Sequence, residues 1–202
     1  KPYQLIDQIK HSDLMPFVKE QLKRKNWSAI GYKVLAVGTA IPLVYLLIMS
    51  HAYQIKGAFD WFSYGMAVTF ALVPLHEYIH ALTYRLCGAK QTSYQAQWTK
   101  FYFMALADRF VASKKEFTWV ALAPFAVISL VCITLTIGLD GGWKVLFAGV
   151  LFTHTAMCGG DFAMLSFLEH YWKQDPITYD DLQTASSYFY IKEPDAPQSP
   201  EL

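Results

Sequence analysis

Charged residues are scarce in this sequence, and their scarcity excludes an ordinary soluble domain. Asp, Glu, Lys and Arg make up 16% of the 202 residues, whereas hydrophobic residues make up 54%. Soluble domains carry about 25% charged residues, and the mean hydropathy here is positive, at +0.22. The composition therefore predicts a protein that crosses a membrane several times.

The sequence also has few cysteines and little net charge, which argues against a disulfide-stabilised protein and against a nucleic-acid-binding one. Of the three cysteines, Cys87, Cys132 and Cys158, no two form a Cys-x-x-Cys pair, so we expect reduced thiols and no disulfide framework. The formal net charge is +1, and no basic patch with interleaved aromatic residues points to nucleic acid as a partner. Residues 1–25 are polar and mixed in charge, so we expect no cleavable signal peptide.

Four apolar stretches are long enough to cross a bilayer, which takes about 20 residues each. They cover residues 29–49, 61–86, 117–139 and 143–171. We expect an all-α polytopic membrane protein with about four transmembrane helices in residues 29–171. A cytoplasmic amphipathic segment (1–28) would precede this domain, and a cytoplasmic tail (172–202) would follow it.

The distribution of Lys and Arg indicates the orientation of the spans. Two of the 17, Lys56 and Lys144, lie in the connections after the first and third spans, and the other fifteen lie on the opposite side. Cytoplasmic loops are enriched in these residues. We therefore expect a multi-pass protein with both termini and the 87–116 loop in the cytoplasm, in a membrane of the bacterial inner or cytoplasmic type.

The second span carries a His-Glu-x-x-His motif, at His76, Glu77 and His80. On a helix the two histidines project from one face and can bind one zinc ion, while Glu77 can act as the general base for water. Ionisable groups in an apolar span are costly and point to function. The alternative is a set of polar residues satisfied between packed helices without a metal. Pro74 predicts a kink in the helix just before the motif. An ordinary kink without any functional role fits this proline equally well.

A third ligand is expected from the fourth span, where His154 and Asp161 are the candidates. At a rise of 1.5 Å per residue, His76 and His80 lie roughly 22 and 28 Å from the outer end of their span, and Asp161 lies roughly 27 Å along its own. His154 lies roughly 16 Å along, about one and a half turns short. Asp161 therefore matches in depth. His154 remains an alternative ligand, a residue that orients a ligand or stabilises an oxyanion, or a satisfied intramembrane histidine without a catalytic role.

Segments outside the spans show weaker patterns. Residues 1–26 resemble an amphipathic helix, and 188–191 a short strand in a polar tail. Residues 92–97 and 100–104, with 108–112 as a third candidate, predict a small β-hairpin between the second and third helices at the cytoplasmic interface. Such a hairpin could bind an extended substrate as an extra strand. The alternative is a plain interfacial loop.

This ordered set of motifs resembles a membrane protein family named "Putative zincin peptidase". The likeness covers residues 61–171 and rests on His76-Glu77-x-x-His80, Ala123-Pro124, and His154 with Gly160-Asp161. More distantly, the set resembles intramembrane metalloproteases of the site-two protease type, although Asp161 here follows a glycine rather than preceding one. The resemblance implies His76, His80 and Asp161 as zinc ligands and Glu77 as the general base.

We therefore expect a zinc-dependent, membrane-embedded peptidase that hydrolyses peptide bonds of membrane proteins within the lipid bilayer. The alternative is an inactive membrane scaffold or chaperone that retains a structural metal site. A diiron oxidase or lipid-modifying enzyme is disfavoured, because such sites use many histidines or paired Glu-x-x-His motifs. The other four histidines, His11, His51, His154 and His170, are scattered. The substrate and the oligomeric state stay open, and two imidazoles with one carboxylate favour zinc as the metal.

Overall fold

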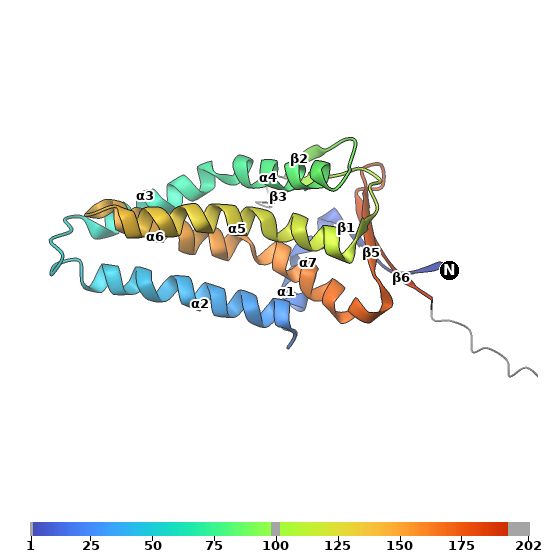
Figure 1. Ribbon diagram of the computed structural model, residues 1–202, viewed down its shortest axis with the longest axis horizontal. Coiled ribbons are helices and arrows are strands. Elements are labelled where there is room, and N and C mark those ends of the chain that lie inside the picture. The colour runs from blue at the N-terminus through green and yellow to red at the C-terminus, as the bar shows by residue number, and fades with distance from the viewer. Residues whose placement is uncertain (1, 98–101, 194–202) are drawn as a thin grey trace, which may run out of the picture.

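The computed structural model describes residues 2–97 and 102–193, which form a long helical body with a small sheet at one end (Figure 1). The helices of the body are α2 (Trp27–Ile48), α3 (Ala58–Ala71), α4 (Val73–Leu86), α5 (Lys114–Gly138), α6 (Gly142–Met157) and α7 (Gly159–His170). A short helix, α1 (Leu14–Gln21), lies near the sheet, with 3-10 turns at His11–Asp13 and Trp172–Gln174. The fold is thus mostly helical, as predicted.

Two of the four predicted spans are continuous helices and two are broken. Helices α2 and α5 are each long and apolar enough to cross a membrane, whereas α3 with α4, and α6 with α7, are pairs bent by 41°. The described chain therefore holds two candidate membrane spans, or up to four if each bent pair counts as one. The first break falls at Leu72, just before Pro74 at the start of α4, and the second falls at Cys158, just before Gly159.

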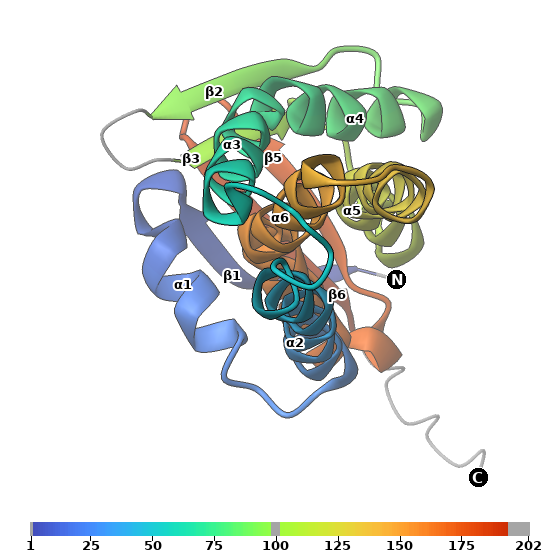
Figure 2. The same cartoon turned by 90° about the vertical axis from the view of Figure 1, so that its left-hand side faces the viewer.

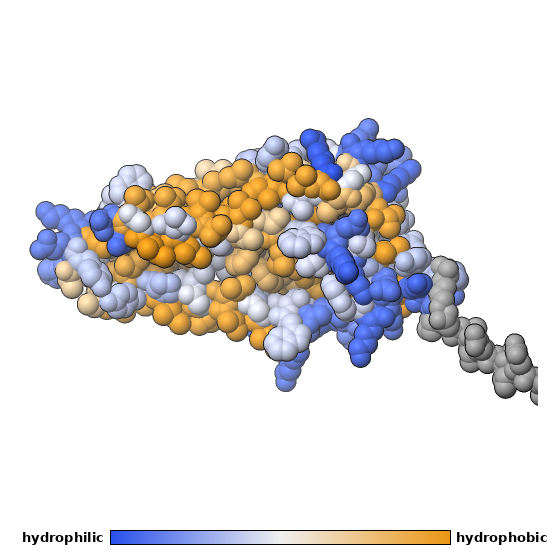
Figure 3. Space-filling view, viewed as in Figure 1, coloured by the Kyte–Doolittle hydropathy of each residue, from blue (hydrophilic) through white to orange (hydrophobic). Residues whose placement is uncertain are grey.

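The helical body has an apolar outer surface, which Figure 3 shows as a belt between polar ends. Large side chains that point outward include Val34 and Ile41 on α2 and Leu130 and Ile137 on α5, each more than half exposed. A soluble protein would not leave so much apolar area in water. The belt agrees with the composition in indicating a membrane protein.

The sheet at the polar end corrects two predictions. Its four antiparallel strands run in the order β1 (Tyr3–Lys10), β6 (Ser186–Lys192), β5 (Ile177–Asp181) and β4 (Ala112–Ser113). The all-α class was therefore wrong in this region. A helix over residues 1–26 was also wrong for residues 3–10, because β1 pairs with β6 along its length and the long-range ladder outweighs the local helical pattern.

Three predicted strands are confirmed at least in part. Strands β2 (Ser93–Gln97) and β3 (Tyr102–Leu106) form a separate antiparallel hairpin, and the predicted strand at 188–191 lies within β6. The candidate strand at 108–112 is reduced to β4 and to an isolated bridge between Asp108 and Asp180. The part of the predicted hairpin at residues 100 and 101, and the tail after residue 193, lie outside the described residues.

Helix α6 organises the body, because it packs against α2, α3 and α5 (Figure 2). The approach of α3 is close at Gly65, where a Cβ atom would overlap the carbonyl oxygen of Leu146 on α6. Small residues let membrane helices come together in this way. This packing fixes the broken α3/α4 pair beside the broken α6/α7 pair, and the two breaks bring polar residues of α4 and α7 together.

Candidate metal centre

Helix α4 presents the His-Glu-x-x-His motif to the interior of the helical body. His80 and Glu77 are 7% and 9% exposed, and His76 is also largely enclosed, with 13% of its side chain exposed. The helical repeat puts His76 and His80 on one face, one turn apart. Their rings meet edge to face, with centroids 4.7 Å apart. The local sequence alone accounts for this part of the site.

Asp161 approaches the same point from α7. Its Oδ1 lies 3.2 Å from Nε2 of His80, and its Oδ2 lies 3.5 Å from Nε2 of His76. The two Nε2 atoms are themselves 3.0 Å apart. Asp161 stands in the first turn of α7, directly after the break at Cys158. The second break in the body therefore delivers the carboxylate to the histidine pair.

Hydrogen bonds behind each ring decide which nitrogen is free. Nδ1 of His80 lies 2.8 Å from the carbonyl oxygen of Val120, which can only accept, so Nδ1 carries the hydrogen and Nε2 keeps its lone pair. Nδ1 of His76 lies 3.0 Å from Nε2 of His154. If Nδ1 of His76 is the donor there, its Nε2 is also an acceptor. Two imidazole lone pairs and a carboxylate then converge with no hydrogen between them, an arrangement that fits a divalent cation.

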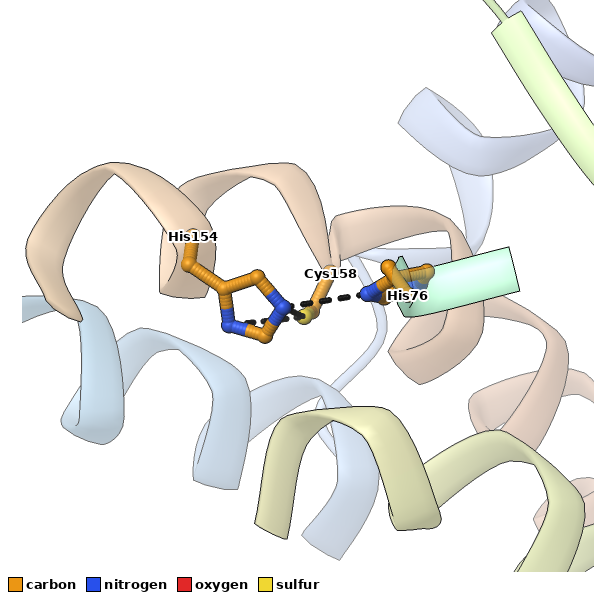
Figure 4. Close-up of side chains that lie close together, drawn as sticks. All are labelled: His76, His154 and Cys158. Atoms are coloured by element: carbon orange, nitrogen blue, oxygen red, sulfur yellow. Dashed lines mark hydrogen bonds between the residues drawn. The ribbon is translucent and has the colours of Figure 1, made fainter. Parts of the chain in front are cut away.

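His154 lies on the opposite side of the His76 ring from Asp161. Figure 4 shows dashed lines from the His154 ring to His76 and to Cys158, whose Sγ is 3.8 Å from the His154 ring nitrogens. His76, His154 and Cys158 form a second group whose donor atoms lie within 4.8 Å of one another, as do those of His76, His80 and Asp161. His154 uses the Nδ1 side of His76, so it does not share the point where His80 and Asp161 meet.

Glu77 is held by the hairpin. Its Oε2 accepts a hydrogen bond of 2.7 Å from the backbone N–H of Ala105 in β3. Strand β3 pairs with β2 on its other side, so this N–H points away from the hairpin ladder. The hairpin thus fixes the orientation of the Glu77 carboxylate, while Oε1 makes no hydrogen bond among the described residues.

These side chains line one cavity of about 500 Å³. Its walls come from helices α1 to α7 and from strands β3, β5 and β6, and most of the lining side chains are apolar. Leu14, Val18 and Leu22 form the side near α1, and Phe103 and Leu106 the side near the hairpin. An apolar cavity with a few convergent polar groups is the usual form of a small binding or catalytic site.

Comparison with known proteins identifies the family. Residues 69–175, more than half of the chain, match the model of the family described as "Putative zincin peptidase". The chain belongs to this family. The match takes in the whole of α4, α5, α6 and α7, and thus the histidine pair and Asp161. No curated protein and no solved structure matches the chain significantly. The family description indicates a zinc peptidase, for which the donor set has the right chemistry.

Several contacts of the site were not predicted from the sequence. The backbone groups of Ala105 and Val120 carry no side-chain signal, because any residue but proline supplies the same N–H and every residue the same carbonyl. Cys158 stands four residues after His154, a helical spacing that could have drawn attention to it. Tyr84, one turn after His80 on the same face of α4, also lines the cavity.

The cavity has a second polar end, formed where β5, β6 and the start of α1 meet. Asp180 and Ser187 line it, and the Ser187 hydroxyl donates a hydrogen bond of 2.6 Å to Oδ1 of Asp180. Behind Ser187 lies the buried His11, whose Nε2 is 3.5 Å from the hydroxyl oxygen. Nδ1 of His11 lies 3.1 Å from Oε1 of Gln95 on the hairpin. Burial raises the pKa of Asp180 above its ordinary value, against the opposing effect of the Ser187 hydrogen bond.

Proposed function

We propose that this protein is a zinc-dependent peptidase that cleaves membrane protein segments at a site within the membrane. The proposal rests on one observation above all, the convergence of His76, His80 and Asp161 beside Glu77 inside a cavity. The donor atoms lie within 4.8 Å of one another and come from two broken helices of an otherwise apolar body. One helix break precedes the histidine pair, and the other precedes Asp161. Both breaks support a functional site, because non-helical backbone at membrane depth is tolerated where it lines a cavity.

Each residue has a role that follows from its contacts. His76, His80 and Asp161 would hold the ion, oriented from behind by His154 and by the carbonyl of Val120. A zinc ion bound there would supply Lewis acidity, which activates water and polarises a peptide carbonyl. Glu77 would take the proton from the attacking water on Oε1 and pass it to the leaving nitrogen, since Oε2 is occupied by Ala105.

The substrate would bind as an extended chain. An intact transmembrane helix hides its peptide bonds in its own hydrogen bonds, so the bond to be cut must first unwind. Strand β3 lies on the cavity wall and could align such a segment as an added strand. With both termini in the cytoplasm, as the Lys and Arg distribution favours, the cavity would open near the cytoplasmic surface. A site-two protease-like mode of action is thus part of the proposal.

Metal content of the detergent-purified protein tests the site. We expect about one zinc per chain in the wild type, and loss of zinc in both His80→Ala and Asp161→Ala. His170→Ala is the matched control, because His170 is exposed at the end of α7 and lies outside the cavity lining. Zinc retained in Asp161→Ala would move the third ligand elsewhere, and a metal-free wild type would refute the proposal.

Glu77→Gln separates a peptidase from a scaffold. The amide is isosteric and can still accept the Ala105 hydrogen bond, but it cannot accept the proton from water. We expect this variant to bind zinc like the wild type and to cleave no membrane-protein substrate in a reconstituted proteolysis assay. A biological function that survives Glu77→Gln would favour the inactive scaffold or chaperone that retains a structural metal site.

A further inference from the structure

The cavity contains one carboxylate that the proposed chemistry does not use. Glu77, Asp161 and Asp180 line the cavity, and no Lys or Arg is found among the described lining residues. A metal ion would offset the charge of Asp161, and Glu77 would serve as the base. In the described part of this mostly apolar space, Asp180 has no Lys or Arg partner, and the basic group nearest to it is the imidazole of His11, behind Ser187. A buried carboxylate without a directly bound cation is costly.

The surroundings of Asp180 hold it in place without neutralising it. Ser187 binds Oδ1, whereas Oδ2 has no hydrogen-bond partner among the residues that the structure describes. The nearest basic residue along the adjoining segment is Arg109, whose backbone N–H binds the Asp180 carbonyl oxygen. Its guanidinium is turned away, toward Gln183 at 2.9 Å and Asp181 at 3.6 Å. Among the described residues no Lys or Arg contacts Oδ2, and the imidazole of His11 lies behind Ser187, on the Oδ1 side of the carboxylate.

Helix α4 connects Glu77 to the part of the cavity in which Asp180 lies. Tyr84 packs against Ala107 and Phe110, and between these two residues Asp108 and Arg109 are bonded to Asp180. Asp180 therefore lies near the Tyr84 end of α4. Tyr84 follows Glu77 by seven residues, a rise of about 10 Å, which an extended peptide covers in about three residues.

We propose that Asp180 is a specificity residue that binds a cationic group of the substrate, an ammonium or a guanidinium, about three residues from the cleaved bond. This rests on the proposed peptidase function. Substrates with such a group are common, because transmembrane segments carry Lys and Arg at their cytoplasmic ends. Ser187, backed by His11, positions the Asp180 carboxylate for this contact.

Peptide binding to the Glu77→Gln protein tests the subsite without relying on turnover. The probes are fluorescein-labelled peptides with an apolar segment of about 20 residues followed by a single Lys at successive positions, each compared with the norleucine peptide. A second arm places the only cation on a free α-amino group, against its acetylated form, to distinguish side chain from terminus. We expect Lys at one favoured position to tighten binding by about 10- to 100-fold.

Asp180→Asn should abolish this preference and leave the affinity for the norleucine peptide unchanged. Asn retains an acceptor for Ser187, and zinc content checks that the variant is folded. Asp175→Asn is the control, because Asp175 is exposed and paired with Lys114 at 2.6 Å. Equal binding of the Lys and norleucine peptides by protein with Asp180 intact overturns the inference and needs no variant.

Cleavage by the wild-type protein separates the two proposals. Cleavage of all peptides without a basic preference would refute the Asp180 subsite and leave the peptidase function standing. A Lys preference in binding without any cleavage would refute the peptidase function and retain the cation subsite.

Discussion

At the scale of single residues, the site depends on groups that never touch the expected metal position. His80 is oriented by the carbonyl of Val120, and His76 by His154. Each contact engages Nδ1 and leaves Nε2 directed at Asp161. Partners of this kind fix the tautomer and raise the basicity of a ligand, and their loss typically lowers metal affinity.

His154 is the first such partner to test. We expect His154→Ala to weaken zinc binding by about 10- to 100-fold without abolishing it, because Nδ1 of His76 loses its hydrogen-bond partner while all three ligands remain. Chelator competition measures the affinity. His51→Ala is a control in the exposed loop after α2. Complete loss of zinc would instead make His154 a ligand, and an unchanged affinity would remove it from the site.

Asp180 gives a pH-dependent prediction. Burial raises its folded-state pKa above the ordinary value of 3.8, so the folded protein holds this proton more tightly than the unfolded chain does. The associated stability is complete below about pH 4 and is lost as the pH rises through the folded pKa. We expect Asp180→Asn to raise the Tm at pH 8, with the gain vanishing near pH 4. Tryptophan fluorescence during heating in detergent measures it, and an equal Tm at both pH values contradicts the prediction.

At the scale of elements, the ends of helices connect distant parts of the chain. The first turn of α2 is capped twice, by its own Asn26 and by Glu169 of α7. The Glu169 carboxylate accepts hydrogen bonds of 2.9 and 2.8 Å from the N–H groups of Trp27 and Ser28. A negative charge at a helix N-terminus also interacts favourably with the helix dipole. The cap fixes α2 to α7, the helix that carries Asp161.

Removal of this cap should destabilise the helical body. We expect Glu169→Ala to cost about 1–2 kcal/mol, because two N–H groups of α2 lose a charged acceptor. The measurement is thermal unfolding in detergent, with Glu20→Ala on the exposed side of α1 as the control. If Glu169→Ala and Glu20→Ala unfold at the same temperature, Glu169 does not stabilise α2.

At the scale of the whole molecule, an apolar belt separates two polar ends that differ in size. One end holds the four-stranded sheet, and the other holds the short loops after α2 and α5 (Figures 1 and 3). Most of the Lys and Arg residues belong to the sheet end, whereas Lys56 and Lys144 belong to the loop end. The asymmetry predicts that the sheet faces the cytoplasm.

Cysteine accessibility in intact cells tests this orientation. With Cys87 replaced by Ser to remove the one partly exposed native thiol, we expect His51→Cys to react with a membrane-impermeant maleimide. Thr184→Cys, in the turn between β5 and β6, should react only after the membrane is opened. The reverse pattern would place the sheet on the outer side and contradict the proposed entry of substrate from the cytoplasmic surface.

The sequence by itself determined the parts of this protein that depend on local order. The apolar stretches predict the helices, the four-residue spacing of His76 and His80 predicts a shared face, and the alternation after Cys87 predicts the hairpin. Pro74 predicts the bend between α3 and α4. These features follow from short-range periodicity and backbone chemistry, which need no partner from elsewhere in the chain.

Only the tertiary structure decided how these parts meet. It joins β1 to β6, near opposite ends of the chain, where the local pattern of residues 3–10 predicts a helix. It sets His154 behind His76, beside Nδ1, and binds Glu77 to a backbone N–H of β3. It also brings Asp180 into the same cavity as Asp161. Such contacts arise from packing between distant segments and from backbone groups shared by nearly all residues, so no local pattern of side chains encodes them.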